Sequence, residues 1–230
     1  MGELDERCPT GIKSFDKLCQ GGFVRDSINL VTGNAGAGKT TFILQFLYNG
    51  AEIGENGLYL SFEPEVQDLY RDAKKHGWDF ENLDKKGKCK VLKMSTKSSV
   101  KEIGDKLAAL IAKYDIRRVC FDPINVFAVS LQDKSDIRQQ IFDLVTMLKK
   151  ISVTVLIAGE ADEERENGQT VNDNIVFTKY LVDGVVELYS SGLGGAGDRA
   201  IRISKMRGTN HFRGPVEMSI KDNGINISGK

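Results

Sequence analysis

Cysteine, proline and histidine are all scarce in this sequence. Its 230 residues include four cysteines, four prolines and two histidines. Because no two cysteines have the C-x-x-C spacing and only two histidines could join them, we expect no zinc site. We interpret the cysteines as reduced and mostly buried thiols, because disulfides are rare in a reducing compartment. The prolines are too scattered to mark a linker, and we expect one domain over residues 1–230.

The sequence also lacks an excess charge and a long apolar run. Lysine plus arginine number 32, as do aspartate plus glutamate, so the formal net charge is zero. This balance disfavours a protein that holds nucleic acid by bulk charge, although it does not exclude a local basic groove. No apolar run approaches the ~20 residues of a membrane-spanning helix. The first residues are acidic and lack the apolar core of a secretory signal, so we expect a cytoplasmic protein without a membrane span.

Strand-like and helix-like segments alternate along most of the chain. The predicted strands are residues 27–32, 57–62, 89–94, 117–122 and 153–158. The predicted helices are residues 39–53, 66–76, 100–114 and 137–151, the third preceded by a capping box of Ser99 and Glu102. Such alternation is typical of an α/β protein whose helices cover both faces of a twisted parallel sheet. After residue 182 two or three strands are predicted around a glycine-rich turn, and we expect them to extend the sheet as β-hairpins.

Residues 33–40 match the phosphate-loop (Walker A) pattern G-x-x-x-x-G-K-[ST]. The loop directly follows a predicted strand and directly precedes a predicted helix, as in P-loop NTPases. Backbone N–H groups of its small residues and the helix N-terminus can surround a phosphate. We expect Lys39 to reach the β- and γ-phosphates and the Thr40 hydroxyl to bind Mg²⁺. The expected nucleotide-binding residues of this segment are Gly33, Asn34, Ala35, Gly36, Ala37, Gly38, Lys39, Thr40 and Thr41.

Three acidic residues at strand ends are candidates for the rest of the site. Asp122 ends a predicted strand and would be the carboxylate ligand of Mg²⁺, the alternative being an acid that only begins a turn. Glu63 ends the strand after the phosphate-loop helix and would act on the attacking water. Glu65, two residues on, is expected instead to face the N-terminus of the next helix. No N-K-x-D sequence of guanine-specific proteins is present, so we expect ATP.

The segment before the phosphate loop resembles the lead-in of KaiC-type domains, in the RecA/RadA ATPase superfamily. It matches the pattern T-G-I-x-x-F-D-x-L-x-x-G-G through Thr10-Gly11-Ile12, Phe15-Asp16, Leu18 and Gly21-Gly22. Further matches are Ser61-Phe62-Glu63, Gly77-Trp78-Asp79, the segment K-M-R-G-T-N-H at 205–211 and the segment I-K-D-N-G-I-N-I at 220–227. The resemblance runs from about residue 9 to residue 227.

The resemblance implies a RecA-like core and a ring, usually a hexamer, with ATP or ADP bound between subunits. Lys205 and Arg207 would then enter the site of the neighbouring subunit and stabilise charge on the γ-phosphate. Thr209, His211, Lys221 and Asp222 would line the same incoming face near the ribose and base, and Met206 is grouped with them as a nucleotide contact.

Side-chain alternation along the predicted strand of residues 201–207 does not settle the role of Lys205 and Arg207. A period of two places Lys205 and Arg207 on one face together with Ile201 and Ile203. They could therefore equally be outward charges on an edge strand.

Three departures from the family pattern bear on activity and structure. Pro64 stands where KaiC-type domains often carry a second glutamate, so Glu63 would act alone or with Glu65, and turnover would be slow. The phosphorylated Ser-Thr pair of the family falls near Lys179-Tyr180, so we do not expect autokinase activity. Arg25-Asp26 stands where a glycine is common.

Three functions are compatible with these features. They are a regulatory or signalling ring ATPase, a recombinase paralogue that binds single-stranded DNA, and a non-catalytic ATP-binding scaffold. Fewer than 30 residues precede the core, without an F-x-x-A tether, which predicts no separate DNA-binding domain. A predicted loop carries Arg165 and six acids, at 160, 162, 163, 164, 166 and 173, and should repel DNA. We interpret the lysines at 85, 86, 88, 90, 93, 97 and 101 as a solvated face, and favour the first function.

Overall fold

The computed structural model describes residues 6–127, 133–161, 173–195 and 197–228. Its strands are β1 (Arg7–Cys8), β2 (Phe23–Val24), β3 (Ile28–Gly33), β4 (Asn56–Ser61), β5 (Cys89–Lys93), β6 (Ile116–Asp122), β7 (Thr154–Glu160), β8 (Gly184–Ser190), β9 (Arg199–Met206), β10 (Val216–Lys221) and β11 (Gly224–Ile227). Its helices are α1 (Lys13–Leu18), α2 (Lys39–Glu52), α3 (Val66–Lys74), α4 (Phe80–Lys85), α5 (Val100–Tyr114), α7 (Lys134–Leu148) and α8 (Asp173–Leu181).

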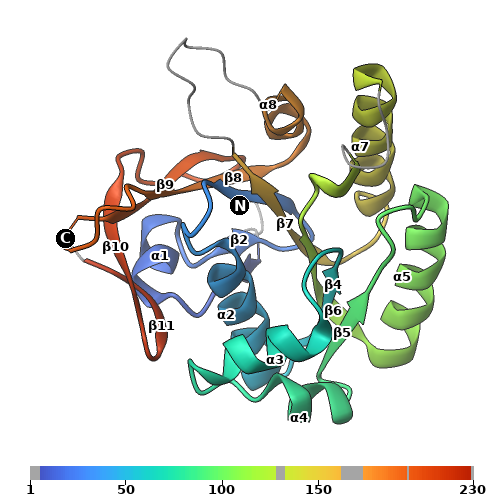
Figure 1. Ribbon diagram of the computed structural model, residues 1–230, viewed down its shortest axis with the longest axis horizontal. Coiled ribbons are helices and arrows are strands. Elements are labelled where there is room, and N and C mark those ends of the chain that lie inside the picture. The colour runs from blue at the N-terminus through green and yellow to red at the C-terminus, as the bar shows by residue number, and fades with distance from the viewer. Residues whose placement is uncertain (1–5, 128–132, 162–172, 196, 229–230) are drawn as a thin grey trace, which may run out of the picture.

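A nine-stranded sheet forms the centre of the protein, with helices on both of its faces (Figure 1). The strand order is β11-β10-β9-β8-β3-β7-β6-β4-β5. Neighbours from β8 through β5 are parallel, whereas β8, β9, β10 and β11 pair antiparallel. The expected α/β architecture, a parallel core with a hairpin extension, is therefore confirmed.

Two apolar layers hold the helices against the sheet. One layer packs α1, α2, α3 and α4 on the first face, with Phe42 and Phe46 of α2 at its centre. The other packs α5, α7 and α8 on the opposite face, where Ile103 and Leu144 are buried. Strand β3 contacts both layers and is buried along its whole length, which explains its near-continuous apolar sequence. The capping box at Ser99 and Glu102 forms as predicted.

The main elements lie within a few residues of their predicted positions, but several others were not predicted. The described residues after 182 form four strands instead of two or three, and helix α8, which begins at the end of the predicted loop, was not predicted. Only Ile175 and Thr178 of α8 are buried, so its sequence has little helical periodicity to detect. The short α1 and α4 and the β1–β2 pair were also missed. All four cysteines are free and buried, as expected.

The lead-in segment, which runs from Thr10 to Gly22, is held by its own hydrogen bonds and packs against α2. The Asp16 carboxylate accepts hydrogen bonds from the backbone N–H and the hydroxyl of Thr10, at 2.9 and 2.7 Å. Gly11 has φ +83°, and a Cβ there would lie 2.6 Å from the Cβ of Asn49 on α2, so only glycine fits. Asp26 has φ 57°, which explains why glycine is common at this point of the family pattern. These motif residues therefore maintain the fold.

An ion cluster centred on a buried arginine joins the lead-in to the core. Arg118 on β6 is fully buried, and its Nε lies 2.6 Å from a carboxylate oxygen of Glu55. Arg25 binds the other oxygen of Glu55, also at 2.6 Å. The guanidinium of Arg118 also donates to the backbone oxygens of Pro9 and Phe46, each at 2.8 Å. Although burial opposes its ionisation, hydrogen bonds from Arg25 and Arg118 hold the pKa of Glu55 below its usual value.

Glu55→Ala should lower the free energy of unfolding by about 3–5 kcal/mol, because it leaves Arg118 buried without a counter-charge. Since the pKa of Glu55 is lowered on folding, its contribution is present at neutral pH and disappears as the pH falls through that pKa. Urea denaturation at neutral pH would measure the loss. Glu81→Ala, which breaks the exposed pair with Lys85, is the control and should change nothing measurable. Equal stability of the two variants would contradict the assigned role of the cluster.

Candidate nucleotide-binding site

The phosphate loop lies at the C-terminal ends of four neighbouring parallel strands, which together form one edge of the sheet. Gly33, the last residue of β3, pairs in register with Glu160 of β7, and Ser61 of β4 pairs with Asp122 of β6. Because β7 lies between β3 and β6, these strand ends follow one another along one edge. The sequence had placed Glu160 in a loop beyond the preceding strand, whereas it ends that strand beside the phosphate loop.

The loop takes its shape from positive-φ glycines and from anchors on distant strands. Gly36 and Gly38 have φ values of 73° and 99°, and Gly38 is the N-cap of α2. A Cβ on Gly38 would lie 2.7 Å from Cδ1 of Ile220 on β10, so this position requires glycine. The Asn34 side chain donates to the Ser190 carbonyl at 2.7 Å and accepts from its N–H at 3.1 Å. These contacts hold the loop in place beside β8.

The Lys39 ammonium group lies across the loop. Its Nζ donates to the carbonyls of Gly33 and Asn34, at 2.8 and 3.0 Å. Burial lowers the pKa of Lys39, while the charges of Glu160 and Asp122 oppose that shift. The group therefore sits where a phosphate cradled by the loop would meet a cation, as the motif predicts. The half-buried Thr41 follows on α2 without a side-chain hydrogen bond among the described residues.

Thr40 and Asp122 offer the oxygen atoms that Mg²⁺ prefers. The Thr40 hydroxyl donates to Oδ2 of Asp122 at 3.2 Å, across 82 residues of sequence. Burial raises the pKa of Asp122, and hydrogen bonds from Tyr59 and Thr40 and the charge of Lys39 oppose the rise. Within the described part of the chain, no group of three or more His, Cys, Asp or Glu side chains could hold a metal ion. The residues thus fit a cation that takes its remaining ligands from phosphate and water.

Tyr59 is a member of this cluster that sequence reasoning missed. It lies on β4, is fully buried, and donates its phenolic hydrogen to Oδ2 of Asp122 on the neighbouring strand. Its sequence context reads as an ordinary buried strand, and no motif marks it. Only the pairing of β4 with β6 brings the two residues together.

Glu63 and Glu65 occupy different environments. Glu63 is exposed just beyond β4, and partial desolvation, followed by the charges of Asp122 and Glu160, raises its pKa. Glu65 is the N-cap residue of α3 and forms an ion pair with Lys93. Of the two, Glu63 therefore has the electrostatic coupling to the site. A catalytic role for Glu63 stays a prediction.

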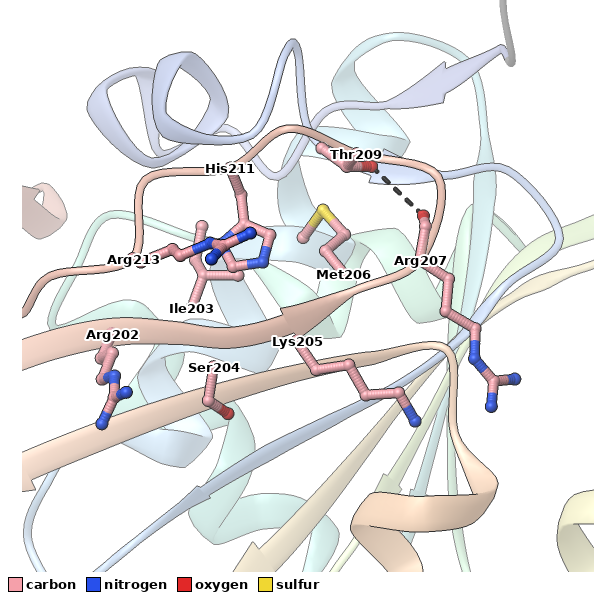
Figure 2. A pocket seen from close by; sticks show the side chains of 9 residues that line it. All are labelled: Arg202, Ile203, Ser204, Lys205, Met206, Arg207, Thr209, His211 and Arg213. Atoms are coloured by element: carbon pink, nitrogen blue, oxygen red, sulfur yellow. Dashed lines mark hydrogen bonds between the residues drawn. The ribbon is translucent and has the colours of Figure 1, made fainter.

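Lys205, Met206, Arg207, Thr209 and His211 line one pocket of about 390 Å³. Figure 2 shows this pocket between the end of β9 and the loop of residues 207–213, which also contributes Arg213. Strand β9 runs antiparallel to β8, so its Arg199 end lies beside Ser190, whereas its Met206 end lies beside Gly184. The pocket extends along β9 from Arg202. A strand of 8 residues spans roughly 23 Å, so the Met206 end of β9, where Lys205 and Arg207 lie, is far from the phosphate loop of the same chain.

The alternation predicted for β9 is wrong at its end. A register shift opposite Val185/Val186 pairs these residues with Lys205 and Ile203, so Ser204 is an extra residue. Met206 consequently joins Ile203 on the buried face, and Figure 2 shows Lys205 pointing to the other side. Strand β9 lies between β8 and β10 in the sheet, but its pairing with β10 covers only Arg199–Ile201. At Lys205 the strand therefore pairs with β8 alone, so the alternative of an edge strand stays open there.

Both cations are bound to their own chain beside α8. Lys205 Nζ donates to the carbonyls of Lys179 and Val182, at 2.9 and 2.6 Å. Arg207 Nη1 lies 3.1 Å from Oδ1 of Asp183. Burial lowers the pKa of Lys205, as does the charge of Arg207. The two cations are thus held together at one end of β9.

Lys221 and Asp222 do not line the pocket of Lys205, and their place on one incoming face with it stays a prediction. The pairing of β10 with β9 ends at Met218 and Arg199, and Lys221 lies beyond it, toward the phosphate loop. Its neighbour Ile220 abuts Gly38, and the Lys221 carbonyl lies 3.0 Å from Nδ1 of His76. The motif spacing could not reveal this, because the β9–β10 register decides it.

Comparison with known proteins agrees with this geometry. A family model described as "ATPase: KaiC" matches residues 8–230. The circadian clock oscillator protein KaiC of Synechococcus elongatus is 35% identical over 234 residues, and that of Thermostichus vulcanus is 34% identical over 238 residues. These alignments cover 95% and 96% of this chain but only 43% and 44% of the relatives. The chain therefore spans less than half the length of these curated relatives.

A solved structure supports the same assignment. The crystal structure of a KaiC-like protein from the hyperthermophilic archaeon Pyrococcus horikoshii matches with a TM-score of 0.85 and 30% sequence identity. The match covers 98% of this chain and 100% of that one. With the phosphate loop, the strand-end carboxylates and the RecA-type sheet in place, the chain belongs to the KaiC family of ATPases.

Proposed function

We propose that this chain binds ATP with Mg²⁺ at its phosphate loop and hydrolyses it within a ring, serving a regulatory or signalling role. In the proposed ring, expected to be a hexamer, each subunit supplies Lys205 and Arg207 to the site of the next subunit. One observation carries the proposal. The chain gathers the loop, Thr40, Asp122 and Glu63 at one sheet edge, yet holds its paired cations at the far end of β9. A second copy would bring the two halves together.

In this proposal the residues at the loop divide the work. The loop N–H groups and Lys39 bind the phosphates, while Thr40 and Asp122 hold the metal. Mg²⁺ supplies charge neutralisation when bound. Glu63 orients the attacking water and accepts its proton, for which a raised pKa is suitable. Met206, Thr209 and His211 of one subunit, and Lys221 and Asp222 near the loop of the other, would contact the nucleotide.

Cationic groups supplied by the neighbour would complete the chemistry. Arg207 and Lys205 would neutralise charge that builds up on the γ-phosphate in the transition state. Their present partners, the Asp183 carboxylate and the carbonyls at the end of α8, keep both side chains ordered. Order before binding reduces the entropy lost when the site assembles.

A DNA-binding role receives no comparable support. Three of the lysines in the run between residues 85 and 101 form ion pairs, namely Lys85 with Glu81, Lys90 with Asp84 and Lys93 with Glu65. These pairs reduce the charge available to phosphates. Of the acids expected in one loop, Glu160 and Asp173 belong to β7 and α8, while residues 162–166, including Arg165, lie outside the described residues. None of the helices that the structure describes combines the length and the apolar composition of a membrane-spanning segment.

Size-exclusion chromatography with light scattering tests the ring directly. We expect ATP with Mg²⁺ to convert the protein to a closed oligomer, because the nucleotide lies between subunits and its phosphates are contacted from both sides. Arg207→Ala should weaken this conversion, whereas Arg117→Ala, which removes an exposed cation of β6, should not. A protein that hydrolyses ATP as a monomer at every concentration would contradict the proposed ring.

A further inference from the structure

Tyr59 places a buried phenol beside Asp122, the carboxylate that holds Mg²⁺ in the proposed function. Its side chain is 0% exposed, and its hydroxyl donates to Oδ2 of Asp122. A hydroxyl buried this completely needs a hydrogen-bond partner, because water cannot reach it. Asp122 is itself nearly buried, at 7% exposed. The contact is therefore shielded from solvent on the Tyr59 side.

Both hydrogen bonds recorded for the Asp122 side chain converge on one oxygen. Among the described residues, Tyr59 and Thr40 both donate to Oδ2. A carboxylate that accepts two hydrogen bonds at one oxygen, from a helix and from a strand, has little freedom to rotate. The second oxygen, Oδ1, keeps its lone pairs for other ligands.

We propose that Tyr59 is a positioning residue for Mg²⁺, acting through Asp122. By fixing Oδ2 from inside the sheet, it presents the carboxylate toward Thr40 in the orientation that a small, geometrically demanding cation requires. Partners that orient a ligand in this way typically govern metal affinity by about 10- to 100-fold. The inference rests on the proposed function, because it assumes that Asp122 and Thr40 serve a nucleotide-bound metal.

The same protein contains a second hydrogen bond from a tyrosine to an aspartate, and this one has no link to the nucleotide site. Tyr70 on α3 donates its phenolic hydrogen to Asp84 on α4, and no strand of the phosphate-loop edge contributes to this pair. Substituting phenylalanine for Tyr59 or for Tyr70 removes one oxygen atom and one hydrogen bond from a phenol to a carboxylate. Tyr70→Phe therefore controls for the loss of such a bond in general.

The test compares ATP binding with Mg²⁺ and with EDTA in the full chain, by isothermal titration calorimetry. Tyr59→Phe should bind ATP in EDTA like the unchanged protein, but should lose about 10-fold of the affinity that Mg²⁺ adds. The Mg²⁺ concentration that gives half-maximal binding should rise by a similar factor. Tyr70→Phe should match the unchanged protein in both conditions. Combined with Asp122→Asn, Tyr59→Phe should cause no further loss of the Mg²⁺ effect.

Three results would overturn the inference. One is an unchanged Mg²⁺ effect in Tyr59→Phe, and another is an equal loss of affinity in Mg²⁺ and in EDTA, which would mark a structural role only. The third is binding by the unchanged protein that does not respond to Mg²⁺ at all. Binding without hydrolysis would instead contradict the proposed ATPase activity alone, because the comparison of binding constants needs no turnover.

Discussion

Arg207→Ala should lower the ATPase rate by about 10³-fold or more, and mixing it with Lys39→Ala should restore part of the rate. An arginine supplied to the γ-phosphate from a neighbour contributes roughly 10³–10⁵ in rate. Arg207 lies in the basic pocket at the end of β9, away from the loop of its own chain. Lys39→Ala alone should bind ATP poorly, because the loop loses its cation.

The mixture distinguishes a shared site from a site within one chain. In a mixed ring, an Arg207→Ala subunit keeps its phosphate loop, and a neighbouring Lys39→Ala subunit can supply the missing arginine. At equal amounts, about a quarter of the interfaces would be complete if subunits assemble at random. Steady-state ATPase across mixing ratios, with mixed rings confirmed by mass, is the measurement. A baseline that stays flat would refute the supply of Arg207 in trans.

Glu63→Gln should lower turnover about 10²-fold or more while ATP stays bound. The substitution keeps the shape of the side chain and removes the group that can accept a proton from water. Burial and the charges of Asp122 and Glu160 raise the pKa of Glu63, as expected for a residue coupled to the site. Single-turnover hydrolysis and ATP binding, measured on the same protein, separate the chemical step from affinity.

Glu65→Gln is the matched control for that experiment. Glu65 lies two residues away, carries the same charge, and is engaged by Lys93 at the start of α3. Its loss should therefore leave turnover nearly unchanged. If Glu65→Gln is the inactive variant and Glu63→Gln is not, the two roles are reversed.

Local sequence signals predicted those parts of the protein that depend on local chemistry. The phosphate loop, the capping box of α5 and the alternating strands and helices of the core all follow from residue types at short spacing. The family resemblance added the block from Lys205 to His211, and the structure brings five of its residues into one pocket, namely Lys205, Met206, Arg207, Thr209 and His211.

The features that sequence reasoning missed depend on contacts between distant segments. The register shift at Ser204 places Lys205 on the side of the sheet opposite to Ile203, and no local sequence pattern predicts such a β-bulge. The contact between Tyr59 and Asp122 exists only because β4 and β6 are neighbours. Lys221 lies near the phosphate loop because β10 extends beyond its pairing with β9. Each of these outcomes depends on strand order or register between segments far apart in the sequence, which local residue patterns do not reveal.

The anchoring of the phosphate loop has a consequence for how the protein is made. Asn34 is fastened to Ser190, 156 residues later, and the Arg199 side chain donates to the Gly36 carbonyl at 3.3 Å. Ile220, from the last hairpin, occupies the space beside Gly38. During synthesis the motif therefore leaves the ribosome well before the segments that fix its shape, since Ser190 follows Asn34 by 156 residues. We therefore expect the loop to reach its described shape only when the segments through Ile220 have folded against it, although residues 33–40 alone carry the motif.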